Sequence, residues 1–136
     1  MSQANVEVVQ AALEASQRDD FDAFLSVIDP AIEWQPVLER LVEGAESAYR
    51  GHEGMRRFWN LYRTELEDFE VEAQELRDVG DDRVVLLGRF GWRGAASGVD
   101  VESPVGMVIT VRDEKMIQSI DYLSQHEALE AVGLKG

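Results

Sequence analysis

The sequence contains no cysteine, only two histidines, and no apolar run near the roughly 20 residues that span a membrane. Without cysteine the chain has no disulfide framework, no thiolate ligand for zinc and no cysteine nucleophile. Two histidines in the whole chain argue against a histidine-rich metal centre. We therefore predict neither a bound metal nor another cofactor.

Basic residues are scarce as well. Lysine and arginine together number 13 against 27 aspartates and glutamates, which gives a formal net charge of -14. A surface of this sign repels nucleic-acid phosphates and anionic lipids, so we predict no nucleic-acid partner and no membrane partner. The first ten residues have neither the basic start nor the apolar stretch of a signal peptide, and we expect a cytoplasmic protein.

The rest of the composition fits one globular domain that spans residues 1–136. Hydrophobic residues make up 45% of the chain and charged residues 29%, which are ordinary proportions for a folded domain. A chain of this length buries roughly two-thirds of the surface that its unfolded form exposes. It can therefore build a sizeable core unaided.

Three amphipathic helices are predicted in the first half, where apolar side chains recur every three or four residues. The first covers residues 5–18, and the second follows Asp19 or Asp20 as its N-cap and ends before Pro30. A short strand is predicted at residues 32–35. The second helix should carry an apolar stripe of Phe21, Phe24, Leu25 and Ile28, and the third one of Met55, Phe58, Trp59, Tyr62 and Leu66.

From residue 69 onward the apolar residues alternate, which predicts strands. We expect them at residues 69–79, 83–93, 99–112 and 116–123, followed by a short helix that opens at a capping box on Ser124. Helices gathered on one side of an antiparallel sheet define an α+β architecture. A long, strongly twisted sheet curls around the helices that cover it and leaves a cavity between the layers.

Four sequence pieces resemble the SnoaL-like branch of the NTF2-like superfamily: Tyr49 to Phe58 (YRGHEGMRRF), Leu87-Gly88-Arg89 with Ser97-Gly98-Val99, Val111-Arg112-Asp113 before Lys115, and Tyr122 with residues 127–134. The resemblance implies an α+β cone, in which a curved, mostly antiparallel sheet wraps the N-terminal helices around an internal pocket, and commonly a homodimer through the outer sheet face. It does not specify a function, because this fold hosts several chemistries. Glu114 departs from the family, which usually has glycine in that turn, so a positive φ there would be strained.

Asp121 is the candidate catalytic residue. Alternation along the last strand groups it with Ile117, Ser119 and Leu123. The chain is similar here to SnoaL-type polyketide cyclases, which place an acid/base aspartate on this strand, and the resemblance implies that this group faces the pocket. Burial in an apolar cavity raises the pKa of a carboxyl, which suits proton transfer near neutral pH. The alternative is a strand-end aspartate that bonds a loop or meets water.

Two other chemistries of related proteins are disfavoured by the residues present. Ketosteroid isomerases carry a base aspartate where this chain has Gln35 before Pro36, and their second acid would fall near Val105 or Met107, which are apolar. Limonene-epoxide-hydrolase relatives need an arginine and an aspartate two residues apart on a central strand. Here Arg89 is followed two residues later by glycine.

Seven aromatic residues are candidates for the wall of a ligand pocket: Trp34, Tyr49, Phe58, Trp59, Tyr62, Phe90 and Trp92. Rings at helical or strand spacing also form ordinary cores, so both roles stay open. Ser119, on the face of Asp121, and His52, beside a helix start, complete the candidate site. For His52 the alternative is a capping or surface role.

The remaining charged residues are interpreted as surface features. We expect the acidic run Glu65, Glu67, Asp68, Glu70, Glu72 and Glu75 to be solvated, because its spacing specifies no metal. Glu33, Glu39 and Glu43 surround a long loop that could act as a lid over the pocket. Arg89 and Arg93 are expected to balance acidic neighbours or to serve a dimer contact.

Two functions follow from these observations. The first is an enzyme that uses Asp121 for cofactor-independent acid/base chemistry, of the cyclase or isomerase type, on a hydrophobic metabolite. The second is a non-catalytic module that binds such a molecule or mediates dimerisation. We expect a homodimer in either case, because Val85 and Leu87 would otherwise leave an apolar outer sheet face exposed.

Overall fold

The computed structural model of the chain describes residues 3–36, 44–94 and 97–134. Its elements in chain order are α1 (Gln3–Gln17), α2 (Phe21–Ser26), β1 (Ile28–Gln35), β2 (Tyr49–Arg50), α3 (Gly51–Glu65), β3 (Leu66–Gly80), β4 (Arg83–Gly94), β5 (Asp100–Arg112), β6 (Lys115–Tyr122) and α4 (Gln125–Ala131).

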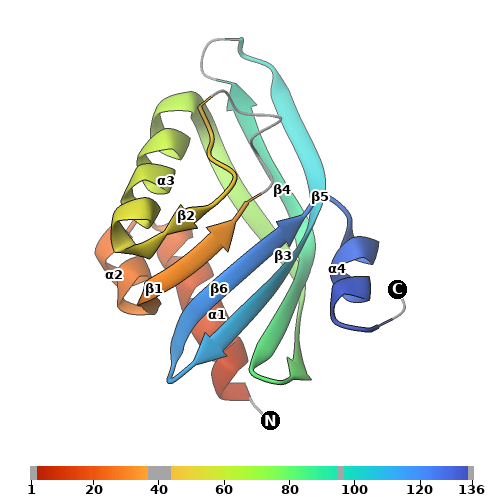
Figure 1. Cartoon of the computed structure of the whole chain (residues 1–136). Coiled ribbons are helices and arrows are strands. Elements are labelled where there is room, and N and C mark those ends of the chain that lie inside the picture. Colours follow the sequence, from red (N-terminus) through yellow and green to blue (C-terminus); the bar gives the residue numbers. More distant parts are fainter. Residues whose placement is uncertain (1–2, 37–43, 95–96, 135–136) are drawn as a thin grey trace.

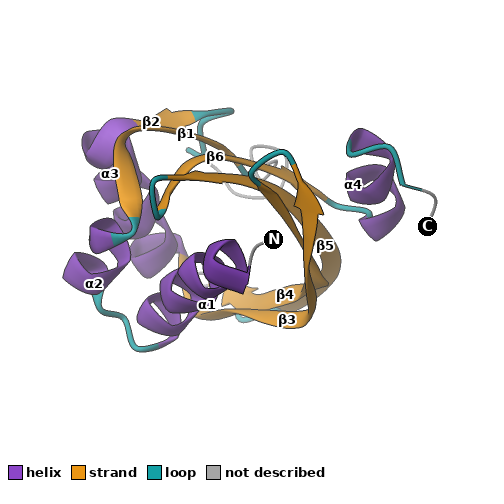
Figure 2. Ribbon diagram, turned by 90° about the horizontal axis from the view of Figure 1, so that it is seen from below, coloured by secondary structure: helices purple, strands orange, loops and turns teal. Residues whose placement is uncertain are grey.

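The strands form one six-stranded sheet in the order β2-β1-β6-β5-β4-β3. All neighbours are antiparallel except β1 and β6, which run parallel. The long strands curl, and α1, α2 and α3 lie on the concave side of the sheet, whereas α4 lies on the convex side (Figures 1 and 2). This is the predicted α+β cone with a curved, mostly antiparallel sheet.

Two helix ends differ from the prediction. Asp20 caps α2 by accepting a hydrogen bond from the Ala23 amide at 3.1 Å, but the helix ends at Ser26 and β1 already begins at Ile28. Pro30 therefore lies inside a strand, where the pairing of β1 with β6 is interrupted between Ile28 and Glu33. Proline cannot donate to a sheet ladder and is tolerated at such irregularities. Leu66, placed in the helical stripe from the sequence, begins β3 instead.

The turn between β5 and β6 adopts positive φ angles, the conformation in which glutamate is expected to be strained. Asp113 and Glu114 adopt φ angles of 52° and 64°. Positive φ at two successive residues is the geometry of a tight hairpin turn, and a β-carbon makes it costly for residues other than glycine and asparagine. Glu114 therefore carries the predicted backbone strain.

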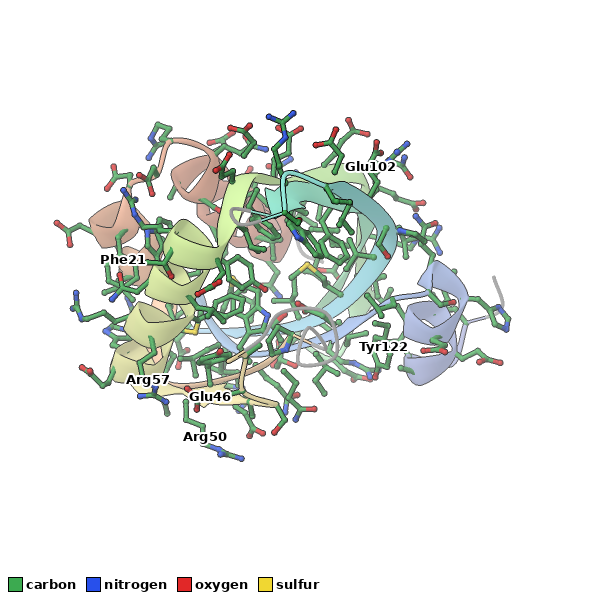
Figure 3. The ribbon with its side chains drawn as sticks, turned by 90° about the horizontal axis from the view of Figure 1, so that it is seen from above. Phe21, Glu46, Arg50, Arg57, Glu102 and Tyr122 are labelled. Atoms are coloured by element: carbon green, nitrogen blue, oxygen red, sulfur yellow. The ribbon has the colours of Figure 1, made fainter. Side chains whose placement is uncertain are left out.

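Two apolar clusters pack on opposite faces of the sheet. The larger one joins the helices α1, α2 and α3 to the concave face. The smaller one lies on the convex face, where Val85, Leu87 and Val108 pack against Ala128 and Leu129 of α4. Figure 3 shows Tyr122 on this α4 side of the sheet.

The convex cluster changes the argument for a homodimer. Val85 and Leu87, expected to lie exposed on the outer face, are 0% and 7% exposed because α4 of the same chain covers them. The two residues therefore require no second copy. The homodimer remains a prediction that rests on the family resemblance alone.

Candidate functional site

A cavity of about 510 Å³ lies between the helices and the concave face of the sheet. Side chains from α1, α2 and α3 form one wall, and side chains from β1 and β3 to β6 form the other. Most of the lining is apolar, including Val105 and Met107 of β5. The volume is in the usual range of small-molecule sites.

Asp121 of β6 lines this cavity and is only 8% exposed. Its Oδ2 accepts a hydrogen bond from Trp34 Nε1 at 2.9 Å, and its Oδ1 accepts one from Ser119 Oγ at 3.0 Å. Burial raises the pKa of Asp121 to about 7, although the two hydrogen bonds act in the opposite direction by favouring the anion. The carboxyl can therefore gain or lose a proton near neutral pH.

An irregularity in β6 decides which of its residues face inward. The pairing of β5 with β6 shifts after Thr110, which pairs with Gln118, whereas Val111 pairs with Met116. Ile117 is therefore the extra residue of a β-bulge, and Met116 takes its place in the core and the cavity wall. Ser119 and Asp121 keep the predicted inward parity beyond the bulge. Leu123, also grouped with them from the sequence, follows the end of the strand and is 37% exposed.

Five of the seven predicted aromatic residues line the cavity: Trp34, Phe58, Trp59, Tyr62 and Phe90. Phe24 and Phe69 also line it and were not named from the sequence. Phe24 shares the predicted stripe of α2, so helical periodicity carried a signal for it. The rings pack on one another, with centroids 4.3 Å apart for Phe58 and Tyr62 and 4.5 Å apart for Tyr62 and Phe69.

The other four candidate residues lie outside the cavity lining. Tyr49 is buried, and its hydroxyl accepts a hydrogen bond from the Glu46 amide at 3.0 Å. Trp92 packs on Phe90 with ring centroids 5.2 Å apart, in the core beside the cavity. Ser119 is fully buried and reaches the site only through its bond to Asp121.

His52 is the fourth of these residues. Its Nε2 lies 2.7 Å from the carbonyl oxygen of Ile28, a contact in which the ring nitrogen is the donor. The bond fastens the start of α3 to the start of β1. The structure therefore gives His52 the structural role that was the alternative to ligand binding.

Tyr62 lines the cavity, and its hydroxyl has no hydrogen-bond partner among residues 3–36, 44–94 and 97–134. Burial is the largest cause that raises the pKa of Tyr62 well above its ordinary value of 10, and the charges of Asp121 and Tyr49 add to it. The hydroxyl therefore stays protonated and can donate a hydrogen bond. From the sequence Tyr62 was expected only as part of an aromatic wall.

Exposed charged residues also line the cavity. Asp19 forms an ion pair with Arg63, and both are half exposed. Asp68 lies in the same lining and is exposed, as is Gln17, which donates to the carbonyl of Val71. These residues form the polar mouth of the cavity. No spacing in the sequence relates Asp19 to Arg63, which are 44 positions apart.

The surface interpretation is confirmed for the acidic run and for Arg89 and Arg93, whereas a lid around Glu33 remains a prediction. All six residues of the acidic run are exposed. Arg89 pairs with Glu102, Arg93 pairs with Asp100 and Glu33 pairs with Arg50. Glu39 and Glu43 lie outside the described residues. Within the described ranges, no cluster of three or more acidic or histidine side chains could hold a metal ion. None of the described helices has the length and apolarity to cross a membrane.

Comparison with known proteins identifies relatives of this architecture. The sequence profile of the SnoaL-like domain matches residues 9–119. No curated protein matches the sequence. An NTF2-like protein of unknown function from Burkholderia pseudomallei shares 20% identity at a TM-score of 0.79, over 98% of this chain and 99% of that one.

Two further solved structures have the same fold. TerC, co-crystallised with polyporic acid, shares 22% identity at a TM-score of 0.79, over 96% of this chain and 98% of TerC. An LEH-like epoxide hydrolase from M. tuberculosis shares 18% identity at a TM-score of 0.72, over 96% of this chain and 90% of the hydrolase. At these identities the similarity establishes a shared fold and does not transfer an activity.

Proposed function

This chain belongs to the SnoaL-like domain family, and on that premise we propose that it binds a hydrophobic, ring-bearing small molecule in its cavity and exchanges a proton with it through Asp121. The observation that carries the proposal is the buried carboxyl of Asp121 in the cavity wall, with a pKa raised to about 7. A carboxyl with a pKa near 7 can serve as base in one step and as acid in the next at physiological pH.

The lining supports a ligand with rings. Seven aromatic side chains surround the cavity, and such walls favour flat or polycyclic molecules through stacked and edge-to-face contacts. The charged residues lie at the mouth, so a ligand can place its apolar body inside without burying an unpaired charge. Proton transfer by a carboxyl needs no cofactor.

The hydrogen bonds to Asp121 favour a second candidate, which is ligand binding without catalysis. Trp34 of β1 and Ser119 of β6 both donate to the carboxyl, so Asp121 joins two neighbouring strands. In this second candidate, Asp121 serves to hold the pocket wall together and not to transfer a proton. The two candidates differ in whether the proton on Asp121 takes part in the reaction.

Substitution of Asp121 by asparagine separates them, because asparagine keeps the shape and the ability to accept from Trp34 but cannot exchange a proton. We expect Asp121→Asn to bind naphthalene, followed by tryptophan fluorescence, with the parent's affinity. Deuterium uptake from D₂O into 2-tetralone, a ring-bearing carbon acid, should fall at least about 100-fold.

Asp68→Asn is the matched control, since Asp68 also lines the cavity but lies exposed at its mouth. Asp68→Asn should change neither the naphthalene affinity nor the rate of deuterium uptake. Exchange at the parent's rate in Asp121→Asn would eliminate the catalytic role and leave the non-catalytic pocket. Failure of the parent to bind naphthalene would contradict both candidates.

A further inference from the structure

The sheet has one long open edge. β3 is the last strand in the sheet order and pairs only with β4 among the described strands, whereas the opposite edge is the two-residue strand β2. In the part of the chain that the structure describes, the backbone groups of residues 72–77 that point away from β4 have no hydrogen-bond partner. Such an edge is a template to which another extended segment can add as a strand.

A groove of about 760 Å³ lies along this edge. Figure 2 shows α1 beside β3, and these two elements form the two walls of the groove. Residues 72–78 of β3 form one wall, and one face of α1 forms the other, with lining residues that recur every three or four positions: Gln3, Val6, Gln10, Leu13, Glu14 and Gln17. Seven strand residues extend over about 23 Å, so the groove is long enough for an extended segment of about six residues.

The lining suits a peptide backbone with alternating side chains. Val6, Leu13 and Leu76 are the buried or half-buried apolar part of the groove. Glutamine side chains accompany them, whose amides can donate to and accept from a peptide backbone: Gln3, Gln10, Gln17 and Gln74. Gln17 already does so within the chain, because its Nε2 donates to the carbonyl oxygen of Val71 on β3 at 3.4 Å. The groove therefore offers both apolar contacts and backbone hydrogen bonds.

The charges of the groove select its occupant. The carboxylates of Glu14, Glu72, Glu75 and Asp78 line it, against the single guanidinium of Arg77. That guanidinium is already paired, because its Nη2 lies 2.6 Å from Oε2 of Glu75. The groove is therefore acidic within a chain whose net charge is -14, and it attracts a basic segment.

The same charges argue against a second copy of this chain as the occupant. If two β3 strands paired edge to edge, Glu72 and Glu75 of each copy would approach the acidic strand of the other, and like charges across a strand pair are destabilising. The bulge between Ala73 and Glu75 also interrupts the ladder with β4, and bulges discourage pairing between identical edges. The edge is thus protected against self-association and remains open to a segment of opposite charge.

We propose that the groove between α1 and β3 binds an extended segment of another protein that carries lysine or arginine, and that this segment adds to the edge of β3 as a further strand. Backbone hydrogen bonds to residues 72–77 supply the affinity, and basic side chains that face Glu14 and Glu72 supply the selectivity. Asp121 lies outside this groove, so the interaction does not depend on the acid/base role proposed above.

A titration with the hexapeptide acetyl-Lys-Val-Lys-Val-Lys-Val-amide, followed by ¹⁵N NMR at low salt, tests the chemistry of the partner. The amide signals of residues 72–77 should shift, and a peptide with glutamate in place of lysine should leave them unchanged. The double variant Glu14→Gln/Glu72→Gln removes a carboxylate from each wall and should weaken binding about three- to tenfold, as expected for two exposed ion pairs. Glu7→Gln/Glu70→Gln is the matched control, because both residues are exposed on the same two elements but lie outside the groove lining. This control should bind the peptide with the parent's affinity.

N-methylation of the peptide separates strand addition from attraction between charges alone. Methyl groups on alternate peptide nitrogens remove the donors along one edge of the peptide and keep its charge. At least one of the two alternating N-methylated forms should bind about tenfold or more weakly than the unmodified peptide, because it cannot complete the ladder with β3. Asp121→Asn should bind the unmodified peptide as the parent does, so a failure of the proposed acid/base role would leave this inference intact.

Four results would overturn the inference. They are the absence of shifts at residues 72–77 with the lysine peptide, equal binding of the glutamate peptide, parent-like binding of both N-methylated forms, and an equal loss of affinity in Glu7→Gln/Glu70→Gln and the groove variant. Shifts of the same amides with protein concentration in the absence of peptide would also overturn it, because they would assign the edge to a second copy of the chain.

Discussion

The two faces of the sheet bury apolar side chains in opposite ways. On the convex face α4 packs closely, and a β-carbon added at Gly106 would overlap that of Ala128. On the concave face the helices stand off the sheet and leave about 510 Å³, with Asp121 and Tyr62 in the wall. The convex face therefore contributes stability alone, whereas the concave face combines stability with a site that costs some of it.

Leu86 and Leu87 are neighbours on β4 whose side chains lie on opposite faces of the sheet. Substituting each one therefore tests the difference between the faces most directly. Leu86 is fully buried and lines the cavity, and Leu87 packs in the convex cluster beneath α4. Leu86→Ala and Leu87→Ala should each reduce the free energy of unfolding by about 2–5 kcal/mol, measured by urea denaturation. Only Leu86→Ala should alter naphthalene affinity. An equal change in affinity for both would mean that the faces are not independent.

The burial of Asp121 in the concave site should lower the free energy of unfolding as the pH rises. The pKa of Asp121 is about 7 in the folded protein against an ordinary value of 3.8, so the folded state holds this proton more tightly than the unfolded state. The stability that protonated Asp121 provides is therefore lost as pH rises from about 4 to about 7, by up to about 4 kcal/mol.

Asp121→Asn should remove this loss. We expect the variant to match the parent's stability near pH 4 and to exceed it at pH 8, by calorimetric unfolding at both pH values. The exposed carboxylates titrate alike in both proteins, so the difference between them isolates Asp121. A variant that is less stable than the parent by the same amount at both pH values would show that Asp121 is a structural linker.

Trp34 and Trp59 both line the cavity, but only Trp34 bonds Asp121 in the described structure. Trp34→Phe removes a hydrogen bond that favours the carboxylate, so the pKa of Asp121 should rise by about one unit, which matches the worth of such a bond. The pH profile of deuterium uptake should move to higher pH accordingly. Trp59→Phe should leave the profile in place, and a shift of equal size in both variants would assign the effect to altered packing.

Periodicity was sufficient to predict much of this architecture. Alternation along β6 placed Asp121 and Tyr122 on opposite faces, as found, and the helical stripe of α3 contained Phe58, Trp59 and Tyr62. Both signals are local, because they depend only on the spacing of neighbouring side chains.

What could not be predicted depends on contacts between distant segments. The bulge at Ile117 moves Met116 inward, and nothing within β6 marks it. The burial of Leu87 depends on where α4 docks. The hydroxyl of Tyr49 accepts from the Glu46 amide, whereas that of Tyr62 has no partner in the described part of the chain. Composition and spacing treat the two tyrosines alike.

The pKa of Asp121 tests the central claim most directly. Carbon-detected NMR of the side-chain carboxyl, followed from pH 4 to pH 9 with Asp121→Asn to assign the signal, measures it in the folded protein. The structure predicts a midpoint of about 7, because burial outweighs the hydrogen bonds from Trp34 and Ser119. A carboxyl that is already ionised at pH 4, with its midpoint at or below the ordinary value of 3.8, would show that the carboxylate is solvated or fully compensated, and it would contradict the acid/base role of Asp121.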